Sequence, residues 1–373
     1  MLIPRTPEMS ITRFQDKGGI VDLGIKGKRV LVTGHTGFKG AWLCLILNYL
    51  GANVTGYSLK LKKNDNFIFF KSLNLKKKIK SYYGDTVDKN KLSLIIKKSK
   101  PELLFHLAAQ SLVIESFKDP KMTFESNVIG AENILNICKT QKYLRSLIIV
   151  TSDKCYLNLG KKKNFKENSP LGGNDPYSSS KAMVERLVKF YFHRVYNKTP
   201  IGLATVRAGN VIGGGDFSNN RIVPDIVKHI LKKKKLVLRN PKSYRPWQHV
   251  FDVLLGYLNL GFKLYKNKKR FSGSYNFGPN IKKNYTVLKL TQNFLNKLAI
   301  KKYRIKFIKN KFYESNCLNI NSTKSRKKLN WKTSYSGSKM IDKTIDWYKS
   351  FINEPKKISQ FSKKQVFDYF SSF

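Results

Sequence analysis

The feature that most constrains the fold is a glycine-rich turn, TGHTGFKG, which follows the apolar run RVLV and precedes the helical stretch AWLCLILNYLG. Gly34, Gly37 and Gly40 stand at a G-x-x-G-x-x-G spacing, a variant of the dinucleotide-binding fingerprint. Glycines there allow a tight turn and let a pyrophosphate approach the positive end of the following helix. The pattern predicts a strand, a phosphate-binding loop and a helix, and a purely structural turn is the alternative.

The rest of the first half repeats this alternation of apolar strands and helices. The further segments are the strands ANVTGYSL, IKSYYGD, PELLFHLAA (101–109) and SLIIVTS (146–152), with helices at about 88–98 and 121–140. Strands that alternate with helices form a parallel sheet covered on both faces. We therefore predict an α/β fold with a Rossmann-type, doubly wound parallel sheet.

The second half has a different texture, with more loops and glycines after Arg207. We expect a smaller substrate-binding domain whose segments interleave with the main sheet, with helices near 222–235, 286–298 and 337–351. The predicted organisation is a flexible N-terminal tail (1–26), a dinucleotide-binding domain (27–206), a substrate-binding region (207–353) whose strand near 273–279 returns to the sheet, and a C-terminal tail (354–373).

Composition matters because a net charge of +49 on 373 residues raises the possibility of nucleic-acid binding. The excess of basic residues is nearly all lysine, spread in short runs, whereas arginine is better suited to recognise phosphates and bases. We expect loose attraction to polyanions and no specific nucleic-acid binding. The four cysteines form no metal-ligand or disulfide pattern, which favours a cytoplasmic protein without a metal. No apolar run reaches the ~20 residues of a membrane span.

A second motif, PYSSSKAMVERLVKFY, places Tyr177 and Lys181 at i and i+4, so both project from one face of a helix. A nearby ammonium favours the phenolate, so such a tyrosine can lose its proton near neutral pH and take a proton from a substrate hydroxyl. An exposed tyrosine and a solvated lysine are the alternative. The strand-end stretch VTSDKCY adds Ser152, Asp153 and Lys154 at the tip of a core strand.

With the glycine loop, HLAAQS, TSDK and YSSSK, the chain resembles the extended short-chain dehydrogenase/reductase family of nucleotide-sugar enzymes from about residue 27 onward. TSDKCY, RAGNVIGGGDF, RIVPD and RPWQHV are similar, more narrowly, to the 4,6-dehydratase branch that acts on CDP-glucose. The resemblance implies an NAD-dependent cycle: oxidation at C4 of the hexose, loss of water across C5–C6, and hydride return to C6. Dehydration of dTDP-glucose, GDP-mannose or UDP-N-acetylglucosamine, or epimerisation, are the alternatives.

The resemblance also implies roles for the catalytic residues. Tyr177, with Lys181 beside it, takes the O4 proton, Ser152 hydrogen-bonds that oxygen, and Asp153 protonates the departing C6 hydroxyl. Lys154 stands where the dTDP-glucose branch carries a glutamate base. It could act as the base if its pKa falls, hold a water, stabilise the enolate, or merely orient Asp153 by an ion pair.

The cofactor contacts implied by the resemblance come from the glycine loop, the third and fourth strands, and the Tyr–Lys helix. They are Gly34, Thr36, Gly37, Phe38, Gly40, Asp85, Ala108, Gln110, Tyr177 and Lys181. An acid after the second strand ordinarily binds the ribose of NAD, but GYSLKLKK has none, and Lys60 could meet a 2′-phosphate. NAD over NADP is therefore implied by the resemblance alone. Asp85 contacts the adenine end or is a turn residue.

The substrate contacts expected from the resemblance are Asn127, Arg207, Asn210, Arg221 and Arg245. Arginine suits a diphosphate because its fork donates two parallel hydrogen bonds. We expect His249 to pack or to start a helix, Trp247 to belong to the core, and His35 to do no acid–base work. A homodimer or higher oligomer through helices 121–140 and 177–195 is common in the family.

Overall fold

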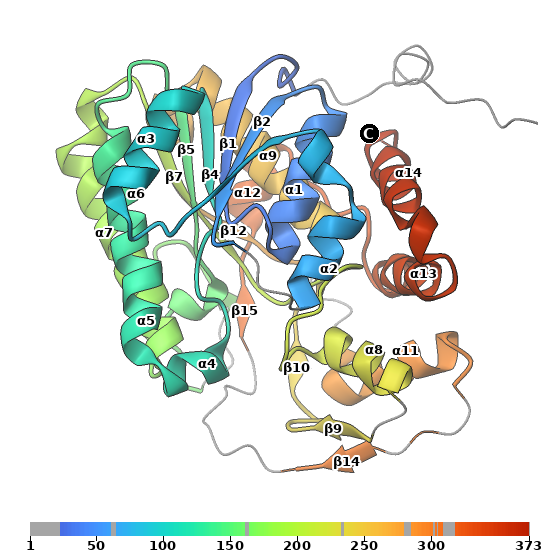
Figure 1. Ribbon diagram of the computed structural model, residues 1–373. Coiled ribbons are helices and arrows are strands. Elements are labelled where there is room, and N and C mark those ends of the chain that lie inside the picture. Colours follow the sequence, from blue (N-terminus) through green and yellow to red (C-terminus); the bar gives the residue numbers. More distant parts are fainter. Residues whose placement is uncertain are drawn as a thin grey trace, which may run out of the picture.

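The computed structural model describes residues 23–60, 65–160, 164–232, 235–279, 285–300, 303, 305–308 and 318–372. Its centre is a seven-stranded sheet in the order β12-β7-β5-β4-β1-β2-β3, with every neighbouring pair parallel (Figure 1). The strands are β1 (Arg29–Thr33), β2 (Asn53–Ser58), β3 (Lys80–Tyr83), β4 (Leu103–His106), β5 (Ser146–Val150), β7 (Gly202–Ala208) and β12 (Gly273–Phe277). The predicted Rossmann-type sheet is confirmed.

Helices cover both faces of this sheet because each strand presents alternate apolar side chains to opposite sides. Val30 and Val32 of β1 join one core cluster, whereas Leu31 joins the other. The first cluster includes α1 (Phe38–Tyr49) and α9 (Val250–Lys266). The second includes α3 (Lys89–Ser99), α6 (Gly130–Cys138) and α7 (Pro176–Arg194).

The strand order reverses between β1 and β4, which lie side by side at the centre of the sheet. Chain connections leave these two strands in opposite directions, toward β2 on one side and β5 on the other. Ligands of open α/β sheets bind in the crevice at the carboxyl ends of the strands at such a switch point. The glycine loop follows β1, so the topology places it at this crevice.

A smaller part of the molecule lies beyond the carboxyl ends of the strands (Figure 1). It holds α8 (Ile222–Lys232), α11 (Val287–Lys297), the parallel pair β9 (Leu236–Leu238) with β14 (Ile305–Phe307), and the antiparallel pair β10 (Tyr244–Arg245) with β13 (Tyr285–Thr286). Between its segments the chain returns to the main sheet as α9 and β12, so the second half interleaves with the first.

The helix predicted at 121–140 is interrupted. It consists of α5 (Pro120–Phe124), a π-helical turn η3 (Glu125–Ile129) and α6. Single π-turns of this kind often occur at functional sites. The turn contains Asn127, whose buried side chain is described below.

The prediction of a C-terminal tail over 354–373 was wrong. Residues Ile358–Phe370 form α14, which packs beside α13 (Ser338–Asn353) and α1, and its Tyr369 and Phe370 are buried (Figure 1). The Tyr369 hydroxyl donates to Asp252 Oδ1 of α9 at 2.7 Å. Apolar residues near the end of the segment give this helix an apolar face that packs against the core.

The predicted N-terminal tail lies outside the described residues from 1 to 22. Leu23 and Ile25 are buried in the same core cluster as α1, so the packed structure begins before residue 27.

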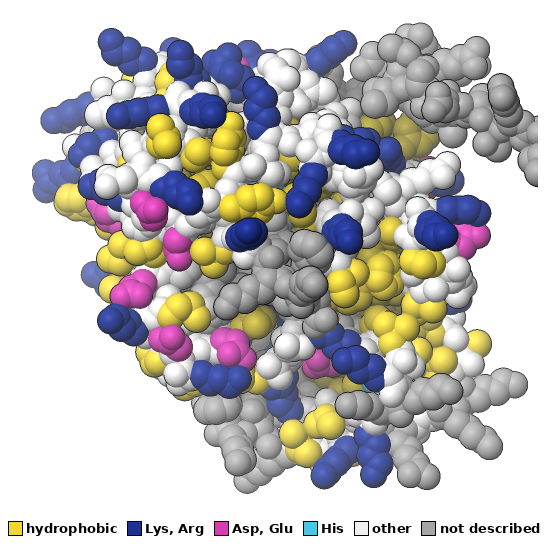
Figure 2. Space-filling model, in the orientation of Figure 1, with side chains coloured by type: hydrophobic (Ala, Val, Ile, Leu, Met, Phe, Trp, Pro, Cys, Tyr) yellow, Lys and Arg dark blue, Asp and Glu magenta, His cyan; other side chains and the backbone are white. Residues whose placement is uncertain are grey.

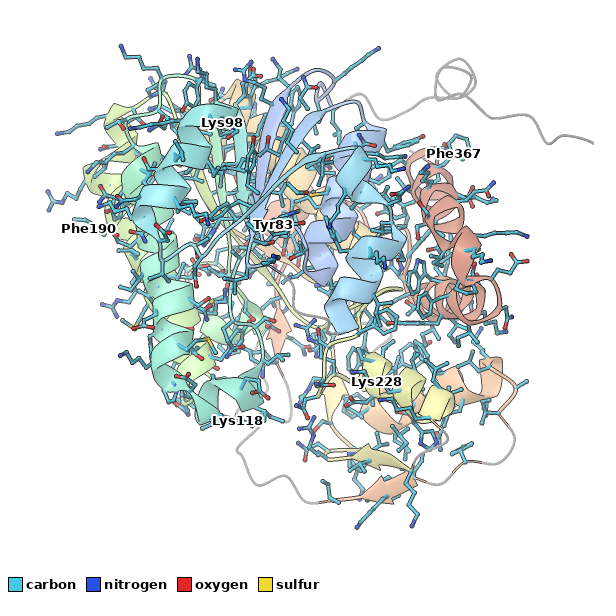
Figure 3. The ribbon with its side chains drawn as sticks, in the orientation of Figure 1. Tyr83, Lys98, Lys118, Phe190, Lys228 and Phe367 are labelled. Atoms are coloured by element: carbon cyan, nitrogen blue, oxygen red, sulfur yellow. The ribbon has the colours of Figure 1, made fainter. Side chains whose placement is uncertain are left out.

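The basic side chains are scattered over the visible face and form no single patch (Figure 2). Lys98, Lys118 and Lys228 lie on three different helical segments (Figure 3). In the part of the chain that the structure describes, no helix is long and apolar enough to span a bilayer.

Candidate active site

A cavity of about 610 Å³ opens at the switch point, between the carboxyl ends of the strands and the smaller part of the molecule. Its walls come from the glycine loop, the loops after β3 and β4, the tip of β5, the start of α7, and the segments around α8, β9 and β10. A volume in this range accommodates a sizeable ligand. All but three of the sequence-predicted site residues line it; Gln110, Asn127 and Arg207 do not.

The glycine loop is shaped for close backbone approach. Gly34 has φ +71°, and a Cβ on it would lie 2.7 Å from the Ala108 amide nitrogen. A Cβ on Gly40 would lie 2.1 Å from the Gly34 carbonyl oxygen, whereas a Cβ on Gly37 would meet only that oxygen, at 3.4 Å. Gly37 begins the twelve-residue α1, and no side chain caps its amides. The loop therefore fits the pyrophosphate of a dinucleotide.

At the far end of the glycine loop, the cavity is lined by Thr36, Ser58 and Asp85. The Thr36 and Ser58 hydroxyls share a hydrogen bond of 2.9 Å, which joins the loop to the end of β2. Asp85 Oδ1 accepts from the Val87 amide at 3.1 Å, so this carboxylate also closes a turn. Lys60 is exposed and does not belong to the cavity wall.

Gln110 and Asn127 support the cavity from behind. The Gln110 amide donates to Asn127 Oδ1 at 2.8 Å, and Asn127 Nδ2 donates to the Gln110 carbonyl at 3.0 Å and to Ser180 Oγ at 2.9 Å. Asn127 thus joins the loop after β4 to α7. In this structure both side chains are engaged in hydrogen bonds within the protein and neither lines the cavity, so their contact with a ligand stays a prediction.

The tip of β5 carries the hydroxyl, the acid and the amine. Ser152 Oγ accepts from the Lys154 amide at 3.2 Å and donates to Asp153 Oδ1 at 2.9 Å, which starts the short η4 turn (Asp153–Cys155). Burial raises the pKa of Asp153, while Lys154, Ser152 and Arg245 oppose that rise. A carboxyl with a raised pKa stays protonated at a higher pH, which suits a proton donor.

Lys154 lines the cavity beside Asp153 and is partly exposed. Among the described residues it takes part in no ion pair within 4.0 Å. The alternative in which Lys154 only orients Asp153 by a direct ion pair therefore lacks its contact. The Lys154 charge still acts on the neighbouring carboxyl, because it lowers the pKa of Asp153.

Helix α7 brings Tyr177 and Lys181 to the same cavity. Asp175 caps the helix by accepting from the Ser178 amide at 2.9 Å, and Lys181 Nζ donates to the Val150 carbonyl of β5 at 3.4 Å. A hydrogen bond with Ser152 lowers the pKa of Tyr177, but burial has the larger effect and raises that pKa to about 12. Burial and Lys39 lower the pKa of Lys181 to about 8, and Glu185 opposes them.

Burial therefore opposes the expected loss of the Tyr177 proton near neutral pH, and that loss stays a prediction. The spacing of the motif reports a neighbouring charge, whereas the burial of the phenol depends on the tertiary structure.

Three predicted polar groups line the side of the cavity that belongs to the second half: Asn210, Arg221 and Arg245. Arg221 is held by Asp216 Oδ2 at 3.0 Å and donates to Ser111 Oγ at 3.0 Å. Arg245 is buried and close enough to Asp153 to lower the pKa of that carboxyl.

Arg207 differs from the prediction. Its guanidinium is buried and pairs with Glu185 of α7 at 2.6 Å, away from the cavity wall. Successive side chains of a strand point to opposite faces, and it is the neighbouring Ala208 that lines the cavity. Without knowledge of the facing direction, the sequence could not distinguish the two.

Two neighbours of Arg245 behave as expected. His249 caps α9 by accepting from the Phe251 amide at 3.2 Å, and Trp247 is buried within the core while also touching the cavity.

The sequence reasoning missed Lys39, the residue before the last glycine of the loop, which lines the cavity. Burial and Arg221 lower its pKa to about 8, while Asp153 and Asp216 oppose that shift. A charged residue inside a phosphate-binding loop was the available signal.

Comparison with known proteins gives one family. The model of the GDP-mannose 4,6 dehydratase family matches residues 31–344. CDP-glucose 4,6-dehydratase of Salmonella typhimurium is 36% identical over 352 residues, covering 93% of this chain and 97% of the relative. dTDP-D-glucose 4,6-dehydratase of Dictyostelium discoideum is 27% identical, covering 87% and 82%.

Solved structures agree. dTDP-glucose 4,6-dehydratase from Bacillus anthracis, in complex with NAD, superposes with a TM-score of 0.71 at 25% identity, covering 87% of this chain and 97% of that one. UDP-glucuronic acid 4-epimerase from Bacillus cereus, with UDP-glucuronic acid and NAD, gives 0.75 at 22% identity, covering 86% and 99%, and it supports the fold alone.

Proposed function

This chain belongs to the GDP-mannose 4,6-dehydratase family of nucleotide-sugar enzymes, and from that premise we propose that it converts CDP-D-glucose to CDP-4-keto-6-deoxy-D-glucose and water, with NAD as cofactor. The observation that carries the proposal is one cavity that holds Tyr177, Lys181, Asp153 and Lys154 opposite a pyrophosphate-binding loop. Epimerisation needs the tyrosine and the loop, but no acid for a departing hydroxyl.

The glycine loop and the start of α1 would hold the NAD pyrophosphate, with Asp85 toward its adenosine. Bound NAD would supply a hydride acceptor for C4, a hydride donor for C6 and a positive charge on its nicotinamide ring. That charge would add to the Ser152 hydrogen bond and to Arg221, both of which lower the pKa of Tyr177 against the larger effect of burial. Tyr177 then takes the proton of the C4 hydroxyl.

Elimination follows from the same strand tip. The C4 ketone acidifies the C5 hydrogen, and Asp153, whose pKa is raised by burial, donates a proton to the departing C6 hydroxyl. Lys154, which follows Asp153 in the same turn and also lines the cavity, serves this step as well. It accepts the C5 proton, holds a water that does so, or stabilises the negative charge at O4, and the first two roles require an uncharged amine or an ordered water.

The second half supplies recognition. Arg245 and Arg221 would bind the diphosphate of the nucleotide sugar, because an arginine fork matches phosphate oxygens, and Asn210 lines the same side of the cavity. The proposed division is a dinucleotide-binding body to residue 206 and a substrate-binding region beyond it, with α9, β12 and α14 returned to the body.

We also propose a homodimer in the cytoplasm. Met122 of α5, Ile129 of η3, and Met183 and Phe190 of α7 are each at least 40% exposed, on helical segments that lie side by side (Figures 1 and 3). Such a row of large apolar side chains is typical of a protein interface. The described cysteines Cys44, Cys138 and Cys155 are free and buried, as expected in a reducing compartment.

Mass spectrometry tests the reaction. CDP-glucose, dTDP-glucose, GDP-mannose and UDP-N-acetylglucosamine are incubated separately with the enzyme and NAD. We expect loss of one water from CDP-glucose alone. Loss of water from another sugar overturns the substrate, and cofactor binding with no water loss from any of the four overturns the dehydratase class.

A further inference from the structure

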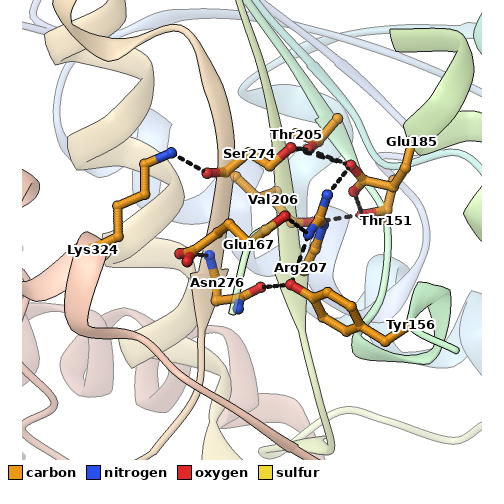
Figure 4. A network of polar contacts seen from close by, with 10 residues as sticks. All are labelled: Thr151, Tyr156, Glu167, Glu185, Thr205, Val206, Arg207, Ser274, Asn276 and Lys324. Atoms are coloured by element: carbon orange, nitrogen blue, oxygen red, sulfur yellow. Dashed lines mark hydrogen bonds and ion pairs between the residues drawn. The ribbon is translucent and has the colours of Figure 1, made fainter. Parts of the chain in front are cut away.

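A buried polar network lies behind the cavity, around the ion pair of Glu185 and Arg207 (Figure 4). The two side chains are 1% and 3% exposed, and neither lines the cavity. They touch no ligand site, yet both are bonded to the segments that carry the catalytic groups. The network can therefore influence how the catalytic groups are positioned, although it forms no part of the cavity wall.

The Glu185 end of the pair holds the start of the catalytic loop. Oε1 accepts from Thr151 Oγ1 at 2.5 Å, and Thr151 directly precedes Ser152. The Thr151 amide also donates to the Val206 carbonyl of β7 at 2.9 Å. Glu185 itself stands one helical turn after Lys181 and two turns after Tyr177, so the three side chains share one face of α7.

The Arg207 end holds the other end of the loop. Nη1 donates to the Tyr156 hydroxyl at 2.7 Å and to the Glu167 carbonyl at 2.9 Å. The guanidinium lies 4.9 Å from the centre of the Tyr156 ring. Tyr156 in turn donates to Asn276 Oδ1 at 2.8 Å, and it is the first residue after the η4 turn.

We propose that the Glu185–Arg207 pair is a positioning unit that sets the distance between the oxidation groups Tyr177 and Lys181 and the elimination groups Asp153 and Lys154. The pair binds the loop at Thr151 and at Tyr156, so Ser152, Asp153 and Lys154 lie between two anchors. Because Glu185 belongs to the same helix as Tyr177, its hydrogen bond to Thr151 fixes the position of the loop relative to that helix.

The chemistry of the pair suits this role better than a purely stabilising one. Burying two charges costs most of what their attraction returns, so an apolar pair of similar volume would hold the core about as well. An apolar pair, however, would not direct two hydroxyl groups. The carboxylate here accepts from Thr151, Thr205 and Arg207, and the guanidinium donates to three oxygens.

The test uses conservative variants that remove one anchor each. Thr151→Val and Tyr156→Phe keep the side-chain volume and the ion pair but remove the hydroxyl that anchors the loop. Thr205→Val is the matched control: it removes a 2.8 Å hydroxyl donor from the same carboxylate, but that donor belongs to β7 and not to the loop.

Amide hydrogen exchange without cofactor is the first readout, because it does not depend on activity. We expect faster exchange at residues 152–155 in Thr151→Val and Tyr156→Phe, and wild-type exchange there in Thr205→Val. Equal exchange in all four proteins overturns the proposal, and so does equal acceleration in all three variants, which describes a general loosening of the core.

Kinetics with CDP-glucose are the second readout, and this arm rests on the proposed function. We expect kcat for water loss to fall about 10- to 100-fold in the two anchor variants, because a misplacement of about 1 Å costs a comparable factor. KM should stay within about 2-fold, as the residues that bind the diphosphate are untouched. A wild-type enzyme that dehydrates no sugar refutes the proposed function, while the exchange data still decide on the anchors.

Discussion

The two walls of the cavity are built differently. On the sheet side, the catalytic groups stand on a loop anchored at both ends and on a capped nineteen-residue helix. On the other side, Arg245 stands on a two-residue strand, and Arg221 directly precedes α8. The sheet wall fixes atoms that must meet a reacting bond, whereas the other wall has to hold a diphosphate. With the proposed function, we therefore expect the sheet wall to determine the type of reaction and the other wall to determine the choice of substrate.

If this contrast holds, removal of the Tyr177 hydroxyl should produce the largest fall in kcat. Tyr177→Phe should lower kcat for water loss by roughly 10³- to 10⁴-fold, because a positioned proton acceptor contributes up to that factor. Binding of CDP-glucose, measured by calorimetry with NAD present, should change by less than about 3-fold. A comparable fall in affinity would show that the sheet wall also governs recognition.

Lys154→Gln should separate the two chemical steps. We expect water loss to fall by about 10²- to 10³-fold. Oxidation at C4 should continue, because it depends on Tyr177 and Lys181, so the near-ultraviolet absorbance of reduced nicotinamide should rise when CDP-glucose is added. Asp153→Asn is the matched variant for the acid and should behave similarly. If Lys154→Gln dehydrates at the wild-type rate, Lys154 has no part in elimination.

A change in the other wall should act on binding instead. Arg245→Gln should raise KM for CDP-glucose about 10- to 100-fold, because a hydrogen bond to a charged group contributes about 1.5–3 kcal/mol, while kcat changes little. Arg245→Lys, which keeps the charge but not the fork, should recover only part of the affinity. A fall in kcat alone would place Arg245 with the catalytic groups, through its effect on Asp153.

The smallest expected effect is a shift in the pH profile. The groups with electrostatic influence on Lys181 are Lys39 of the glycine loop, Glu185 of α7 and Cys155 of η4, and Lys181 in turn affects His106 of β4. With a Lys181 pKa of about 8, kcat/KM should fall as the pH rises through that value, because the ammonium that stabilises the Tyr177 phenolate is lost.

Lys39→Met removes a like charge that lowers the pKa of Lys181. The fall in kcat/KM with rising pH, the alkaline limb of the profile, should therefore move to higher pH. An unchanged limb would mean that Lys181 does not control it. Lys97→Met, on the exposed surface of α3, is the control and should leave the profile unchanged.

What the sequence predicted well depends on short spacings. The glycine loop, the Ser–Asp–Lys stretch and the Tyr–Lys pair each lie within one turn of chain, so their geometry is local. Together with the alternation of strands and helices and the resemblance carried by the longer runs of the second half, these features were enough to predict the sheet and the class of reaction.

What the sequence did not predict depends on distant contacts. Arg207 could not be assigned to a face of β7, and the raised pKa of Tyr177 comes from burial beneath other segments. Asn127 has its role only because Gln110 and Ser180 lie beside it in the folded chain. The α14 helix has its role only when the surface of α1 is present to receive it.

That last helix has a consequence for how the protein is made. Asp252 is buried in α9, and Tyr369 of α14 is one of its hydrogen-bond donors. Domains of a growing chain ordinarily fold from the N-terminus as they leave the ribosome. Here α14 supplies part of the core around α1 and α9, so we expect a product truncated before α14 to leave that apolar surface open to chaperones and to aggregation.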